Sequence, residues 1–142
     1  MIYEISDDPA RLDLNVIHRY LSEESYWAQR IPRALVERAV AHSLCFGVYA
    51  GAEQVGFARV VSDRATFAYL ADVFVLPAHR GQELSKRLMA AITAHPELQG
   101  LRRWMLATAD AHGLYRQHGF AALAKPDRFM ERRERIEYGG DA

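Results

Sequence analysis

Apolar residues recur along the chain at two spacings, and the alternation between them predicts the order of its elements. A short run with strand character, MIYEIS, comes first. Residues 13–43 follow helical spacing and contain one proline, Pro32, so we expect two helices separated there. Residues 43–63, SLCFGVYAGAEQVGFARVVSD, favour two strands joined at a turn near Gly51.

The second half continues with a third strand in residues 65–76, ATFAYLADVFVL, and a helix over residues 81–94. Three shorter segments follow, predicted as a strand, a short helix and a last strand, at residues 101–108, 111–118 and 119–123. The sequence therefore predicts a mixed α/β fold with one central sheet and helices on its faces. We expect a single domain over residues 1–142, with roughly the last eight residues forming a frayed tail.

The composition narrows the class of protein. The chain has 142 residues, of which 50% are hydrophobic, enough for one domain with its own core. Eighteen basic and eighteen acidic residues cancel, so the broad positive field that nucleic-acid binding needs is missing, and no nucleic-acid partner is expected. No apolar stretch approaches membrane-spanning length, so no membrane partner is expected either.

The cysteine and the histidines bear on possible disulfides and metal sites. Cys45 is the only cysteine, which excludes an intramolecular disulfide and a zinc site built on several thiolates. The six histidines have no paired metal-ligand spacing. We therefore expect no metal and a cytoplasmic location.

The stretch VFVLPAHRGQELSKRLM, residues 73–89, carries the strongest chemical signal. A strand leads into a tight turn and a helix start, where free backbone N–H groups and partial positive charge attract phosphate. Further on, LYRQHGF places Tyr115 on a short helix closed by Gly119, which should hold the phenol rigidly. Asp72 interrupts an apolar run, and a buried carboxylate must be paired or used: it is a catalytic base, a salt-bridge partner of an arginine, or a sheet-edge residue.

These two motifs, RGxxLxxxLM after a strand and LYxxxGF with its tyrosine thirty-five residues after Arg80, resemble the GNAT superfamily of acyl-CoA-dependent N-acyltransferases. The resemblance runs from about residue 2 to residue 124 and implies a mostly antiparallel sheet splayed near its middle. It further implies direct transfer of an acetyl group from acetyl-CoA to a primary amine. A small molecule is the expected acceptor, while a protein N-terminus or lysine stays open, and homodimers are common in the family.

The resemblance also implies individual roles. The expected cofactor-binding set comprises main-chain groups that hold the pantetheine arm and the oxyanion, and the turn that holds the pyrophosphate: Phe74, Val75, Arg80, Gly81, Gln82, Glu83, Leu84, Ser85, Lys86 and Thr108. For Thr108, capping the next helix is the alternative. Tyr115 would give its proton to the departing CoA thiolate, and the base that receives the amine proton would be Asp72 or Glu24. The acceptor pocket, or else a helix packing face, would be formed by Tyr26, Trp27 and Arg30.

Glu83 departs from the family pattern, which has glycine at this position, and Ser85 departs more mildly from glycine or alanine. A carboxylate facing pyrophosphate repels it, so we expect a working site with moderated CoA affinity, unless the side chain turns to solvent or pairs with Lys86 or Arg87. The alternative is a catalytically weakened acyl-CoA-binding or protein-interaction module of the same fold.

Overall fold

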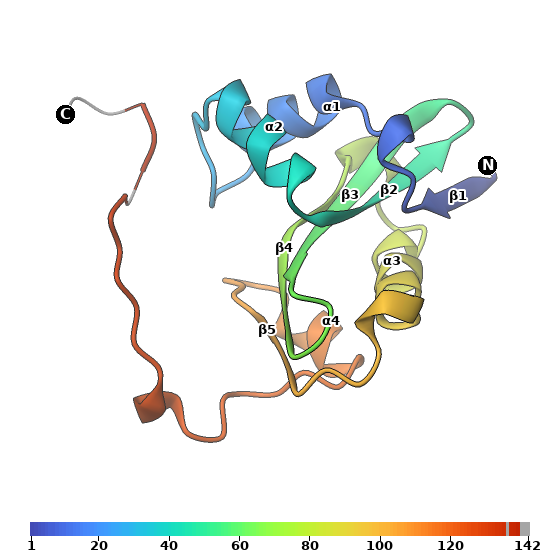
Figure 1. Ribbon diagram of the computed structural model, residues 1–142. Helices are drawn as coiled ribbons and strands as arrows, with labels where there is room; N and C mark the ends of the chain where they lie inside the picture. The colour runs from blue at the N-terminus through green and yellow to red at the C-terminus, as the bar shows by residue number, and fades with distance from the viewer. Residues whose placement is uncertain (136, 140–142) are drawn as a thin grey trace.

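The computed structural model describes residues 1–135 and 137–139 and is built on a five-stranded sheet (Figure 1). In their order across the sheet, the strands are β1 (Tyr3–Ser6), β2 (Leu44–Ala50), β3 (Glu53–Ser62), β4 (Phe67–Val75) and β5 (Arg103–Leu106). Neighbours pair antiparallel from β1 to β4, whereas β4 and β5 pair parallel. The mostly antiparallel sheet expected from the sequence is therefore confirmed.

Helices cover both faces of this sheet (Figure 1). The helical segments are α1 (Leu14–Arg19), a π-helical turn (Tyr20–Glu24), α2 (Arg33–Ala41), α3 (Leu84–Thr93) and α4 (His112–Arg116). Residues from α1, the π-helical turn and α2 share a buried cluster with Phe57 and Phe74. Residues from α3 and α4 share another with Phe46 and Val48. The predicted mixed α/β architecture is thus confirmed.

Two predicted helices differ at their ends. The helix expected from residue 81 begins at Leu84, because Gly81 and Glu83 both adopt a positive φ (80° and 59°) that no α-helix accommodates. The helical pattern before Pro32 stops at Glu24, and Ser25–Pro32 form a loop. Ser25 is 1% exposed, and its hydroxyl donates to Leu21 O (2.6 Å) and accepts from Ala28 N–H (3.1 Å).

The strand predicted at residues 119–123 is wrong. Gly119 has a φ of 90°, and the N–H of Phe120 donates to Tyr115 O (3.2 Å), which closes α4 instead of opening a strand. The Phe120 ring packs edge-on against Trp104 and Tyr115, so its apolar character serves the helix cap. Residues 121–123 are exposed and pair with no strand among the described residues.

After α4 the chain runs along the outside of the molecule (Figure 1). The predicted frayed tail lies partly on residues 136 and 140–142, outside the described residues. Within the described part, the Arg30 guanidinium lies 3.9 Å from a carboxylate oxygen of Glu137 and donates to Gly139 O (3.4 Å). None of the described helices has the length and apolar character needed to cross a bilayer.

Candidate active site

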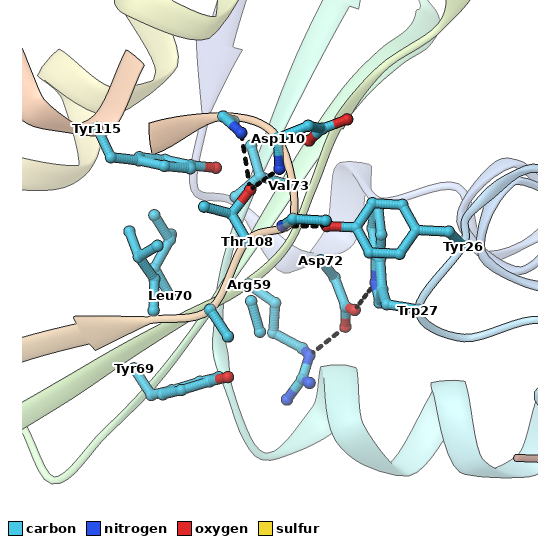
Figure 2. A pocket seen from close by; sticks show the side chains of 15 residues that line it. Tyr26, Trp27, Arg59, Tyr69, Leu70, Asp72, Val73, Thr108, Asp110 and Tyr115 are labelled. Carbon is cyan, nitrogen blue, oxygen red and sulfur yellow. Dashed lines mark hydrogen bonds and ion pairs between the residues drawn. The ribbon is translucent and has the colours of Figure 1, made fainter. Parts of the chain in front are cut away.

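The last two strands of the sheet, β4 and β5, separate and leave a cavity between them. β4 pairs with β5 only from Phe67 to Leu70, and from there to Val75 it pairs with β3 alone. The predicted splay is therefore present, but it lies between the last two strands and not near the middle of the sheet. A cavity of about 470 Å³ opens there (Figure 2), lined by Tyr26, Trp27, Arg59, Tyr69, Leu70, Ala71, Asp72, Val73, Leu106, Ala107, Thr108, Ala109, Asp110, Ala111 and Tyr115.

Main-chain groups of β4 alternate between β3 and this opening. The N–H of Leu76 donates to Val55 O (2.8 Å), so Phe74, which pairs with Phe57, also directs its main chain toward β3. Val75 and Val73 consequently direct theirs toward the open side. Of the two residues expected to hold the pantetheine arm, Val75 fits, whereas Phe74 is turned away and its ring stacks on Tyr20 at 4.0 Å between centroids. Counting the alternation back from the end of the strand could have identified Val73.

A turn rich in unpaired N–H groups follows β4. The N–H of Arg80 donates to Pro77 O (3.3 Å) and that of Arg87 to Glu83 O (3.2 Å). Between them, no main-chain N–H has a carbonyl partner within the described ranges. The predicted pyrophosphate-binding residues Gly81, Gln82, Leu84, Ser85 and Lys86 occupy this segment. The Leu84 side chain is 2% exposed in the core, so only its backbone could serve a ligand.

Glu83 stands in this turn in the left-handed conformation, with φ 59° and ψ 24°. A residue with a β-carbon there costs about 1–2 kcal/mol relative to glycine. Its carboxylate makes no capping hydrogen bond, lies 3.6 Å from the Lys86 ammonium, and is 75% exposed. The Glu83 side chain therefore both turns to solvent and pairs with Lys86, as foreseen, while Arg87 donates to Tyr3 O (3.1 Å) instead.

Arg80 is partly engaged by the protein itself. Its Nε donates to Val75 O (2.9 Å), and Nη2 donates to the Tyr20 hydroxyl (3.0 Å). These bonds tie the turn to the end of β4 and to the π-helical turn. A guanidinium has five N–H donors, so donors remain for an anion.

Tyr115 lies on α4 and points toward the cavity near Thr108 (Figure 2). The residue is 8% exposed, and burial raises the pKa of its phenol above the ordinary value, with smaller contributions from Tyr26 and Asp110. A phenol of ordinary pKa near 10 is already protonated at neutral pH, and the raised pKa keeps it a proton donor. Thr108 Oγ1 accepts from Asp110 N–H (3.4 Å) and Ala111 N–H (3.1 Å), which orders the turn before α4 at the cavity wall, but no side chain caps α4 itself.

The loop Ser25–Pro32 contacts both arms of the splay. The hydroxyl of Tyr26 accepts from Ala109 N–H (2.9 Å), beyond β5, and the indole N–H of Trp27 donates to Asp72 Oδ1 (2.8 Å), on β4. Figure 2 shows Asp72 between Trp27 and Arg59. The Nε of Arg59 donates to Asp72 Oδ2 (2.7 Å), so the salt-bridge alternative for this aspartate is realised.

Two predicted residues lie elsewhere. Glu24 is exposed and does not line the cavity. Arg30 faces the C-terminal segment and a separate cavity of about 300 Å³, which also borders Tyr26 and Trp27. Sequence reasoning missed Arg59; a lone arginine in the apolar run GFARVV, one strand away from Asp72, was the available signal. No cluster of three or more metal-ligating side chains occurs in the part of the chain that the structure describes.

Comparison with known proteins identifies the family to which the chain belongs. The family model described as acetyltransferase (GNAT) domain matches residues 41–122. The chain belongs to the GNAT acetyltransferase family. A GNAT family member from Xanthomonas campestris pv. campestris is 57% identical, with 94% of each chain covered and a TM-score of 0.92. FG08082 of Gibberella zeae, a protein named as an acetyltransferase, is 33% identical over 135 residues, covering 80% of this chain and 75% of that protein.

The GNAT fold also appears in more distant structures. A GNAT family acetyltransferase from Elizabethkingia anophelis, solved with acetyl-CoA bound, is 12% identical, with 91% of this chain and 86% of that chain covered and a TM-score of 0.64. At this identity the likeness concerns the fold alone. The left-handed backbone at Glu83 gives a physical reason for the glycine that the GNAT pattern has at that position.

Proposed function

We propose that this GNAT protein is an N-acetyltransferase that moves an acetyl group from acetyl-CoA to the primary amine of a small molecule. The observation that carries the proposal is that Val73 and the Tyr115 phenol line one cavity between β4 and β5. Burial keeps that phenol protonated, and an N–H-rich turn lies between β4 and α3, after the outward main chain of Val75.

Acetyl-CoA fits the residues present as a co-substrate. The unpaired N–H groups from Gly81 to Ser85 would hold the pyrophosphate, assisted by the start of α3 and by the remaining donors of Arg80. The main chain of Val75 and the wall at Thr108 would guide the pantetheine arm. The acetyl-CoA-bound relative from Elizabethkingia anophelis, which shares the fold, supports this choice.

Two groups of the protein would then assist the transfer of the acetyl group. The Val73 N–H would donate to the thioester oxygen, where negative charge develops as the amine attacks. As the bond between the acetyl carbon and sulfur breaks, Tyr115 would give its proton to the departing thiolate. The amine becomes part of an amide, and no covalent enzyme intermediate is needed.

A small amine suits the acceptor side of the cavity. Its wall there is made by Tyr26, Trp27 and Tyr69, whose ring faces attract organic cations, and by the Asp72 carboxylate. Of the two carboxylates expected to receive the amine proton, Asp72 lies at the cavity and Glu24 does not.

One observation favours a second function. Glu83 puts a negative charge and a strained backbone into the phosphate-binding turn, as expected of a protein that retains the fold but binds acyl-CoA weakly and contacts a partner instead. The two functions differ in what a phenol at the cavity is for, since a binding module needs no proton donor there.

The experiment that separates them combines calorimetry with a turnover assay. Acetyl-CoA is titrated into the protein, and thiol release is then followed with polyamines, amino sugars and amino acid amides as acceptors. Acetyl-CoA binding with thiol release that depends on an acceptor supports the enzyme. Binding without release for any acceptor supports the binding module, and absence of binding refutes both.

A further inference from the structure

Asp72 occupies an extra residue in β4 at the point where the sheet splays. Phe57 pairs with Phe74 and Arg59 pairs with Ala71, so three steps along β4 match two along β3. This is a β-bulge, which re-aims the main chain that follows it. Asp72 has a φ of 54° there, a conformation that aspartate tolerates better than most residues with a side chain. The next residue is Val73, whose N–H would face the thioester oxygen.

The Asp72 side chain anchors this bulge at two points. One carboxylate oxygen accepts from Arg59 Nε (2.7 Å), and the other accepts from the Trp27 indole N–H (2.8 Å). The Arg59 and Asp72 side chains are only 19% and 13% exposed. Arg59 is itself fixed, because its Nη1 donates to the Ser43 hydroxyl (3.2 Å) at the start of β2.

These contacts favour an Asp72 carboxylate that keeps its negative charge during acetyl transfer. If Asp72 took the amine proton, it would neutralise the partner of a largely buried guanidinium, and removing one charge from such a pair is costly. Its two oxygens also already accept one hydrogen bond each from groups that do not belong to a substrate.

We propose that Asp72 is a positioning residue rather than the base, and that it couples the loop Ser25–Pro32 to the Val73 amide through Trp27. Docking of the loop at Trp27 holds the carboxylate, the carboxylate holds the bulge, and the bulge aims the amide. The amine proton then leaves through water at the cavity mouth. This inference rests on the proposed acetyltransferase function.

The test uses three single variants of the 142-residue chain, together with the double variant Trp27→Phe, Asp72→Asn. Trp27→Phe removes the indole donor but keeps an aromatic ring. Asp72→Asn removes the charge. Trp104→Phe is the matched control, because Trp104 is the other of the two tryptophans and packs against Phe120, away from this network. Turnover and acetyl-CoA affinity are measured for each variant, and hydrogen exchange of the Trp27 indole N–H is measured for the wild type, Asp72→Asn and Trp104→Phe.

Positioning predicts that Trp27→Phe lowers kcat by about 10- to 100-fold and leaves acetyl-CoA affinity within about twofold. Asp72→Asn lowers kcat at every pH without changing the shape of the pH–rate profile. The double variant is no slower than Asp72→Asn alone, since both changes break one coupled unit. Trp104→Phe retains wild-type kcat.

A base at Asp72 gives the opposite pattern. The loss in Asp72→Asn would then be relieved as rising pH deprotonates the amine without help, and the double variant would be slower than Asp72→Asn alone. Either result overturns the proposal. Faster exchange of the Trp27 indole N–H in Asp72→Asn is expected whether or not a substrate is found, so failure of the acetyltransferase function and failure of this coupling are told apart.

Discussion

Replacing Glu83 with glycine changes two free energies, and the structure allows both to be sized. The left-handed backbone at Glu83 costs about 1–2 kcal/mol for a residue with a β-carbon. Glycine removes that cost. It also stabilises the unfolded chain by about 0.4–1 kcal/mol, because glycine has more conformational freedom there. We therefore expect Glu83→Gly to raise the free energy of unfolding by roughly 0.5–1 kcal/mol.

The second free energy concerns acetyl-CoA. The Glu83 carboxylate is 75% exposed and turned toward Lys86. At a distance of about 8 Å from a phosphate charge, an effective dielectric between about 20 and 80 gives a repulsion of roughly 0.5–2 kcal/mol. Its removal should tighten acetyl-CoA binding by about 2- to 30-fold.

Glu83→Gln separates the two effects, because it removes the charge and keeps the side chain. Calorimetric titration of acetyl-CoA at low salt should give tighter binding for both variants, with the gain shrinking at higher salt. Thermal unfolding should show stabilisation in Glu83→Gly only. Glu97→Gln, an exposed acid paired with Arg64, is the control. Wild-type affinity in both Glu83 variants at low salt would refute the reasoning.

Three further outcomes follow from named side chains. Burial raises the pKa of Cys45 to about 12, so alkylation of its thiol by iodoacetamide at mildly alkaline pH should be at least about 100-fold slower in the native than in the unfolded protein; equal rates would contradict its burial. The pKa of Asp63 is lowered by hydrogen bonds from the Thr66 hydroxyl and from the N–H groups of Thr66 and Ala65, so its stabilisation is present above the unfolded pKa near 4 and is lost as pH falls. Asp63→Asn should accordingly flatten the acid side of the Tm–pH curve, and an unchanged curve would contradict this role of Asp63. Glu24→Gln should keep wild-type kcat, because Glu24 does not line the cavity; a large loss would mean that the acceptor enters by another route.

The elements of the fold were predictable where their causes are local. Helical spacing, alternation and turn residues identified the first five strands and the helices around them. The last predicted strand failed because apolar residues alone do not supply a pairing partner, and Phe120 packs on a helix cap instead. The late start of α3 depends on the backbone at Glu83, which a side-chain pattern does not report.

The same distinction between local causes and distant contacts applies to the candidate site. Tyr115 and the turn after β4 lie within short motifs, so the sequence pointed to them. The contacts among Arg59, Asp72 and Trp27 join residues 13 and 45 positions apart, and they depend on a bulge in the pairing of β3 and β4. No spacing rule gives that register, so the salt bridge could be named only as one of several roles for Asp72.

The most direct test of the proposed function is turnover by Tyr115→Phe. Thiol release from acetyl-CoA is measured with the acceptor that the wild-type protein uses best, and acetyl-CoA affinity is measured alongside by calorimetry. Loss of the proton donor should lower kcat by about 100-fold or more, with affinity within about twofold of wild type because the phenol acts on the departing thiolate. Unchanged kcat in Tyr115→Phe would contradict the account.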